Sequence, residues 1–147
     1  MSSRVHLAGP DDLDRLETMV ATYHGSAGIE STPDDRRAAI EPLLAGSPHG
    51  AIWLIGPRMS PVGYVAVSFG WSLELGGMDG FIDEIWLREA VRGRGMGSEA
   101  LSELLKSLEQ AGVKAMHLEV DKDTPAGRLY RRLGFKERRY ALMTRYA

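Results

Sequence analysis

A glycine-rich segment with two arginines is the first part of the chain whose residue types point to chemistry. It precedes the clearest amphipathic pattern of the sequence and reads Arg92-Gly93-Arg94-Gly95-Met96-Gly97-Ser98. Glycines let a backbone turn tightly and let a ligand come close to it. The first turn of a helix has unpaired N–H groups and a positive end, which together form an anion site. Arginine adds a forked set of donors suited to phosphate, so we expect a pyrophosphate here.

Other interpretations of this segment differ in what binds it. A turn without a ligand is the simplest, but three alternating glycines cost conformational entropy unless something requires them. A P-loop is excluded because no Gly-Lys-Ser/Thr follows at the required spacing. A dinucleotide-binding fingerprint is formally present from Gly95, with Glu119 as its downstream acid. That motif needs an apolar strand that runs directly into the first glycine, so a nucleotide-dependent oxidoreductase stays a minor alternative.

Two adjacent acids, Asp83 and Glu84, lie in the strand predicted before the glycine segment. Neighbouring strand residues point to opposite faces, so at most one acid faces a shared site unless a bulge intervenes. A carboxylate in that position is a candidate general base, acting directly or through water. The alternative is that both acids are solvated charges on a strand.

The glycine segment and a second motif together resemble the GCN5-related N-acetyltransferase (GNAT) superfamily. The acetyl-CoA signature of that family, Arg-x-x-Gly-x-Gly, is met by Arg92, Gly95 and Gly97. The second element, Ala-x-x-Leu-Tyr-x-x-x-Gly-Phe, is met by residues 126–135. Both motifs occur in the family's order, with a predicted helix and strand between them. The family often has Asn three residues before the motif's alanine, where this chain has Asp123.

The resemblance implies an acetyl-CoA-dependent N-acetyltransferase and gives roles to individual residues. Tyr130 would lie beside the CoA sulfur, where a phenol with a pKa of about 10 can donate a hydrogen bond to the leaving thiolate. The alternative is that Tyr130 is a core aromatic residue. The segment around Asp83 resembles diamine acetyltransferases, in which an acid aligned with Asp83 is the base. The backbone of Leu87 and Arg88 would pair with the pantetheine amides. The implied cofactor-binding residues are Leu87, Arg88, Arg92, Gly93, Arg94, Gly95, Met96, Gly97, Ser98 and Asp123.

The amine acceptor is predicted from charge as well as from that resemblance. Residues 72–84 contain four acids and neither Lys nor Arg, and a stretch of one sign attracts cations. We therefore expect a small cationic amine held by Trp71, Glu74 and Asp79, with Tyr23 and His24 in the segments that select it. Alternatives are a solvated acidic loop, acetylation of aminoglycosides or protein amines, and a non-catalytic acetyl-CoA-binding module.

The elements that must position these residues follow from periodicity and turn signals. Strands are predicted at 4–7, 51–55, 62–69, 81–87 and 116–120, and helices after Gly9, after Thr32, after the glycine segment and over 126–133. Loops are predicted over 24–31 and 71–80, and one or two closing strands over 135–146. The order βααβββαβαβ, with an optional final strand, predicts an α/β (α+β) fold of the GNAT type, a mixed central sheet flanked by helices.

Composition limits the remaining classes. The 147 residues contain no cysteine, 18 Lys and Arg, and 20 Asp and Glu. Without cysteine, and with four histidines in no metal-ligand spacing, we expect no metal. The near-neutral charge disfavours nucleic acid, and no apolar run is long enough to span a membrane. We expect one cytoplasmic domain over 1–147 with a small-molecule amine partner. The sequence leaves open whether the chain forms a homodimer.

Overall fold

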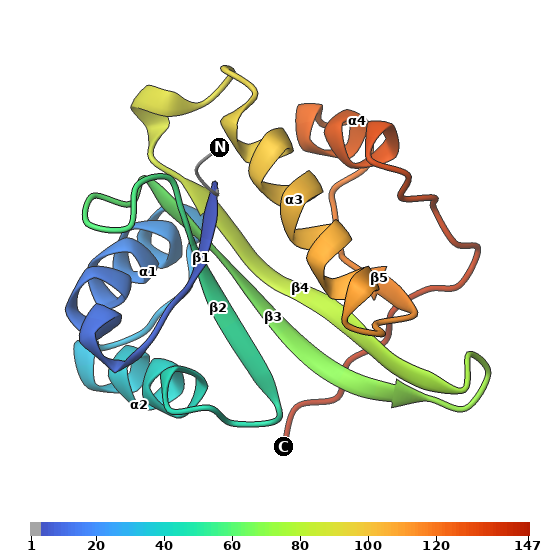
Figure 1. Cartoon of the computed structure of the whole chain (residues 1–147), viewed down its shortest axis with the longest axis horizontal. Helices are drawn as coiled ribbons and strands as arrows, with labels where there is room; N and C mark the ends of the chain where they lie inside the picture. Colours follow the sequence, from blue (N-terminus) through green and yellow to red (C-terminus); the bar gives the residue numbers. More distant parts are fainter. Residues whose placement is uncertain (1–3) are drawn as a thin grey trace.

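The central element of the structure is a five-stranded sheet whose strand order follows the sequence, β1-β2-β3-β4-β5 (Figure 1). The computed structural model describes residues 4–147. Strands β1 to β4 pair antiparallel with their neighbours, whereas β5 runs parallel to β4. The bounds of the strands are Val5–Leu7 (β1), Gly50–Ile55 (β2), Gly63–Ser72 (β3), Gly77–Leu87 (β4) and Ala115–His117 (β5).

Within residues 4–147, four α-helices flank this sheet, and two of them start at hydroxyl caps. The Thr32 hydroxyl accepts a hydrogen bond from the Asp35 N–H, and Pro33 is the first residue of α2, as expected of a capped helix start. Thr124 caps α4 in the same way. The helices are Leu13–Ala27 (α1), Pro33–Leu44 (α2), Met96–Gln110 (α3) and Pro125–Arg132 (α4), with short 3₁₀ turns at Pro10–Asp12 and Glu89–Val91.

Two apolar cores lie on opposite faces of the sheet, because successive strand residues alternate in direction. In β3, Tyr64 and Ala66 belong to the core that contains Leu16 of α1. Val65 and Val67 point to the other side and belong to the other core, which contains Leu104 of α3. The predicted mixed sheet with flanking helices is therefore confirmed, and β4 lies between the two cores.

A β-bulge interrupts the pairing of β3 with β4 at the acid pair. Ala66 lies opposite Glu84 and Val67 lies opposite Ile82, so Asp83 is an extra residue without a partner on β3. A bulge of this kind leaves its extra residue outside the ladder and changes the direction of its side chain. Asp83 and Glu84 are therefore not confined to opposite faces of the sheet.

The sheet splits where β5 ends. The two parallel strands pair only over residues 79–81 and 115–117, with Phe81 opposite His117 as the last pair. Beyond it, β4 continues to Leu87 without β5 beside it. Residues of the second half of β4 and of the chain that follows β5 line a cavity at this split.

The predicted glycine-rich loop over 71–80 is wrong, because this segment is mostly paired strand. Trp71 pairs with Met78, and the turn comprises only the residues between Ser72 and Gly77. A Cβ atom on Gly77 would lie 2.9 Å from the Lys114 side chain, and one on Gly80 would lie 2.6 Å from the Met116 sulfur. These glycines pack closely against side chains of the neighbouring segment and lie in paired strands, so they do not mark a loop. The hairpin extends away from the helices in Figure 1.

Two other predicted boundaries also differ from the structure. The loop expected to start at His24 is wrong, since α1 continues to Ala27 and ends at Gly28, whose φ of 71° is left-handed. The closing strands expected over 135–146 are absent, since residues 136–147 form neither helix nor strand. An alternating pattern forms a strand only beside a partner. None of the described strands pairs with this segment.

Candidate active site

A cavity of about 190 Å³ lies at the split between β4 and β5. Its polar lining comes from four different elements: Tyr23 from α1, the two acids of β4, Glu119 from the chain after β5, and Tyr130 from α4. Its apolar lining consists of Ile82, Ile85, Leu118, Val120 and Ala126. The fold thus brings the two acids and the tyrosine that the sequence singled out to one cavity.

Asp83 is the bulge residue and the acid whose ionisation is perturbed. Partial burial in the cavity raises the pKa of Asp83, and the charges of Glu84 and Glu119 raise it further, while nearby His24 lowers it. A carboxyl with a raised pKa is a better match to a general base working near neutral pH. Among the described residues, no hydrogen bond occupies the Asp83 carboxylate, and solvent still reaches part of the side chain.

Glu84, by contrast, has both carboxylate oxygens engaged. The Tyr64 hydroxyl donates to Oε1 at 2.7 Å, and His24 Nε2 lies 2.8 Å from Oε2. Tyr64 is fully buried, and both its burial and the Glu84 charge raise its pKa, so the hydroxyl keeps its proton. Glu84 is therefore fixed by side chains from β3 and α1.

The contacts of Glu84 continue as a chain of hydrogen bonds into α2. His24 Nδ1 lies 2.8 Å from the Ser31 hydroxyl, which accepts from Arg36 at 3.0 Å. Arg36 also forms an ion pair with Glu17 at 2.9 Å. The His24 tautomer with its proton on Nε2 fits both contacts, since Nε2 then donates to Glu84 and Nδ1 accepts from Ser31. This network attaches the helix pair to β4.

Tyr130 approaches the cavity from the opposite side to α1. Its ring is 9% exposed and packs edge-on against Phe135, with 5.9 Å between centroids. Burial and then Tyr23 raise the pKa of Tyr130, so its hydroxyl stays protonated at neutral pH. Tyr23 also has a raised pKa, from burial and from the two acids of β4. No residue in the described part of the chain accepts a hydrogen bond from the Tyr130 hydroxyl, which lines the cavity.

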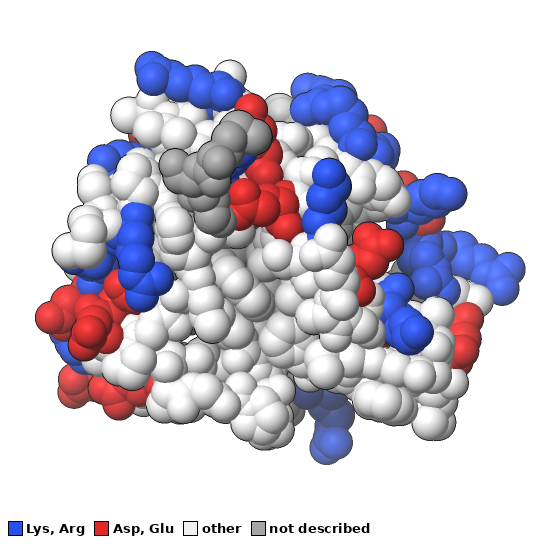
Figure 2. All heavy atoms as spheres, in the orientation of Figure 1, with Lys and Arg blue, Asp and Glu red and all other residues white. Residues whose placement is uncertain are grey.

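The glycine segment has the geometry expected of an anion site. Gly93 and Gly95 both adopt left-handed φ values of 78°, and Gly95 is the N-cap of α3 without a side-chain cap. The N–H groups of the first turn, at Met96, Gly97 and Ser98, therefore have no capping partner. Figure 2 shows Lys and Arg side chains over the loop before α3 and over α4.

Two cofactor-binding expectations are modified by the structure. Gly97 is buried, and a Cβ atom there would lie 2.8 Å from the Leu87 side chain, so this glycine also contributes to the close packing of α3 on β4. The Arg88 N–H is not available to pantetheine, because it donates to the Val62 carbonyl at 2.7 Å. The alternation of an antiparallel ladder then directs the backbone groups of Ile85 and Leu87 away from β3, toward the split.

The remaining predicted residues are not all near the cavity. Arg92 Nε donates to the Leu87 carbonyl at 2.8 Å, and Arg94 is exposed. Asp123 is exposed and has a left-handed φ of 63° just before α4. Trp71 and Glu74 lie at the far end of the hairpin, and Trp71 faces the opposite side of the sheet from Glu84. Trp71 and Glu74, which were expected to hold the amine, are therefore not brought to the cavity that contains the acids.

Glu119 is a cavity residue that the prediction did not include. Its signal was present, because it alternates with Leu118 and Val120 in the predicted strand and so points to the same side as His117. Asp79 lies on the same face of β4 as Glu84, in a second pocket nearer the hairpin.

The comparison with family models decides what kind of protein carries this site. A model of the acetyltransferase (GNAT) family matches residues 14–135, most of the chain and all of the residues that line the cavity. The chain belongs to the GNAT acetyltransferase family. This family uses acetyl-CoA, and the uncapped α3 start with its left-handed glycines fits the phosphates of that ligand.

Solved structures give the same fold. An integron cassette protein, HFX_CASS3, from the mobile metagenome of Cole Harbour Salt Marsh is 30% identical, with a TM-score of 0.86 over 97% of this chain and 90% of that chain. An aminoglycoside acetyltransferase from an uncultured soil sample is 21% identical, with a TM-score of 0.75 and full coverage of both chains (100% each). A ribosomal-protein-alanine N-acetyltransferase from Brucella melitensis biovar Abortus 2308 is 17% identical, with a TM-score of 0.76 over 97% and 98% of the two chains.

A search of proteins with curated functions finds no match. No helix within residues 4–147 is long and apolar enough to cross a membrane. The same residues contain no group of three or more His, Cys, Asp or Glu side chains arranged to hold a metal ion.

Proposed function

We propose that this GNAT protein acetylates a primary amine, with Asp83 as the general base and Tyr130 as the hydrogen-bond donor to the leaving group. The observation that supports it most strongly is the shared cavity, in which a carboxyl with a raised pKa and a protonated phenol come from different elements. When bound, acetyl-CoA supplies an activated acetyl thioester.

The base is Asp83 rather than Glu84 because only Asp83 has a free carboxylate. A lysine-like amine has a pKa near 10.4 and must lose a proton before it can attack. Asp83 accepts that proton at its carboxylate, directly or through one water molecule. Glu84 is held by Tyr64 and His24, and its negative charge both raises the pKa of Asp83 and attracts an ammonium.

Tyr130 contributes at the other end of the reaction. A thiol resembling cysteine has a pKa of about 8.5, so a departing thiolate gains from a donor beside it. The Tyr130 phenol keeps its proton because burial raises its pKa, and its hydroxyl is free to donate into the cavity. The outward backbone N–H groups of Ile85 and Leu87 are available to bind an extended ligand in the manner of an added strand.

Turnover of acetyl-CoA with a panel of amines tests the proposal. The panel contains alkylamines, diamines, an aminoglycoside and a lysine-bearing peptide, and thiol release is followed together with the mass of the product. Asp83→Asn should lower kcat/KM by about 10²- to 10⁴-fold. Tyr130→Phe should lower kcat by about 10- to 1,000-fold while acetyl-CoA affinity changes little, because the lost interaction strengthens in the transition state.

Asp11→Asn is the matched control, since Asp11 is exposed in the turn before α1 and far along the chain from the cavity residues of β4. Thiol release with no amine of the panel, despite acetyl-CoA binding, would favour a non-catalytic binding module. Parent-like activity of both Asp83→Asn and Tyr130→Phe would overturn the assigned roles.

A further inference from the structure

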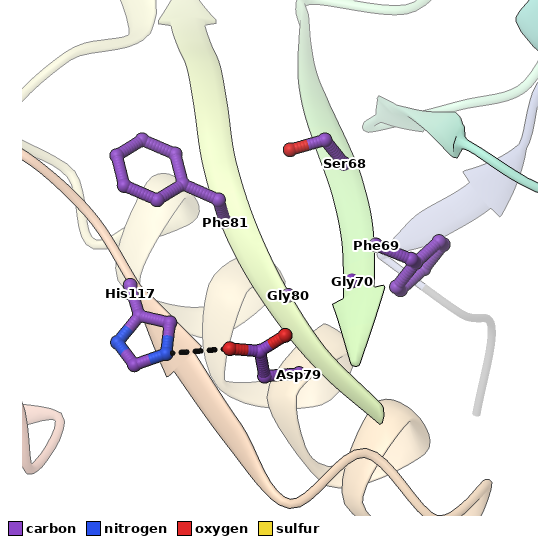
Figure 3. Close-up of a pocket in the computed structure, with 7 residues that line it drawn as sticks. All are labelled: Ser68, Phe69, Gly70, Asp79, Gly80, Phe81 and His117. Carbon is purple, nitrogen blue, oxygen red and sulfur yellow. Dashed lines mark hydrogen bonds and ion pairs between the residues drawn. The ribbon is translucent and has the colours of Figure 1, made fainter. Parts of the chain in front are cut away.

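A second pocket, of about 180 Å³, lies farther along the same strands toward the hairpin (Figure 3). Its lining comes from three neighbouring strands: Ser68, Phe69 and Gly70 of β3, Asp79, Gly80 and Phe81 of β4, and His117 of β5. The roles proposed for Asp83 and Tyr130 do not use this pocket, and Asp79 is the one lining residue that was expected from the sequence to hold an amine.

The carboxylate of Asp79 is only partly used by the protein. Its Oδ2 lies 3.1 Å from His117 Nε2. Its Oδ1 has no hydrogen-bond partner among residues 4–147 and faces Gly70, where a Cβ atom would approach it to 3.1 Å. The glycine therefore leaves one carboxylate oxygen accessible, although only 25% of the Asp79 side chain is exposed.

The pocket is on the same face of the sheet as Glu84. The register pairs Ala66 with Glu84, Ser68 with Phe81 and Gly70 with Asp79. These residues alternate in step along their strands, apart from the bulge. In β5, His117 and the cavity residue Glu119 follow the same alternation. Phe81 lies between Asp79 and the acid pair along β4, and its side chain is on the same side of that strand as His117 (Figure 3).

We propose that the Asp79–His117 pocket binds the second cationic group of a linear diamine whose first amino group is acetylated at Asp83. An ammonium has three donors, which can be shared by Asp79 Oδ1 and the Ser68 hydroxyl. Phe81 provides an apolar surface for the methylene chain between the two nitrogens, and its ring face also attracts a cation. This inference rests on the proposed function and adds the length and charge of the acceptor.

The strand spacing sets the length of that diamine. Asp79 lies opposite Gly70, and the bulge places Asp83 beside Ala66 and Val67, so the two acids are about three and a half strand steps apart, or about 12 Å at ~3.3 Å per residue. An extended chain advances roughly 1.2 Å per bond, since three backbone bonds span ~3.3–3.6 Å. Each nitrogen lies up to about 3 Å inside this span, so the nitrogens are about 6–12 Å apart and about five to ten bonds between them fit. Diaminooctane meets this length, and diaminopropane does not.

The test compares diaminooctane, diaminopropane and octylamine as acceptors of the full-length protein. We expect the highest kcat/KM for diaminooctane. Asp79→Asn should lower that value by about 10- to 100-fold, the range of a lost hydrogen bond to a charged group, and should leave octylamine unchanged. Gly70→Ala places a methyl group against Asp79 Oδ1 and should also lower kcat/KM for diaminooctane. Asp34→Asn, an exposed acid at the start of α2, is the control.

Direct binding of diaminooctane, measured by calorimetry on the parent and on Asp79→Asn, separates the two levels of the proposal. Weaker binding to Asp79→Asn without any turnover would overturn the proposed function alone. Octylamine used as well as diaminooctane, or equal binding of diaminooctane to both proteins, would overturn the second subsite and leave the acetyltransfer intact.

Discussion

The hydrogen bond from Tyr64 to Glu84 offers the most direct test of how the acid pair is held. Tyr64 is fully buried, and its hydroxyl donates to Glu84 Oε1 at 2.7 Å. Tyr64→Phe keeps the ring and removes only this donor. A hydrogen bond to a charged group contributes about 1.5–3 kcal/mol. We expect the free energy of unfolding to fall by about 1.5 kcal/mol, the lower end of this range, because the Glu84 side chain is 20% exposed and water can reach it.

Urea unfolding followed by tryptophan fluorescence measures this loss. The midpoint should fall while the slope of the free energy against urea stays constant, since the same surface is exposed. For a chain of this size the expected decrease in Tm is about 3–6 °C. Tyr140→Phe is the matched control, because Tyr140 is 65% exposed and its hydroxyl only accepts from Arg139.

A double-mutant cycle with Glu84→Gln assigns the effect to the pair. The two substitutions should be less than additive, with a coupling energy of about 0.5–3 kcal/mol. Tyr64→Phe that is as stable as Tyr140→Phe, or full additivity with Glu84→Gln, would refute the view that this bond fixes Glu84.

Three further predictions concern the cavity and the core. Glu84→Gln or Glu119→Gln removes a charge that raises the pKa of Asp83, so the acid limb of the pH profile of kcat/KM should move to lower pH; an unmoved limb would contradict the assignment. The pKa of Asp83 is higher in the folded than in the unfolded state, so its ionisation opposes folding as pH rises through the folded value. Asp83→Asn should therefore have a Tm equal to or higher than that of the parent at pH about 8. Scanning calorimetry should show that this gain disappears in acid. Leu104 is 1% exposed, so Leu104→Ala should lower the free energy of unfolding in urea by about 2–5 kcal/mol. Leu73 is 93% exposed, so Leu73→Ala should leave that free energy almost unchanged.

The elements that sequence predicted well are those with local signals. The leucine spacing of α3, the Thr32-Pro33 start of α2 and the glycines before α3 each specify their structure through neighbouring residues. The acid pair and Tyr130 were also identified from the sequence, and the fold brings them to one cavity. Their roles stay predictions.

The parts that sequence missed depend on contacts between distant segments. Whether Asp83 is a bulge depends on the register of β4 against β3, which no local pattern specifies. From the sequence alone, Gly77 and Gly80 of the hairpin are typical of a loop. In the structure they pack against Lys114, just before β5, and Met116, within β5. The alternating residues of 136–147 resemble a strand, but no described strand pairs with them.

The separation of the two apolar cores by one sheet also affects how such a chain can diverge in evolution. The core with α1 and α2 and the core with α3 contact different sides of β3, so substitutions in one should add independently to substitutions in the other. Sequence changes in α1, which carries Tyr23 and His24, and in α2 can therefore accumulate without loosening the packing behind the glycine segment. A protein with this architecture can change the amine that it accepts in evolution while it keeps its binding site for acetyl-CoA.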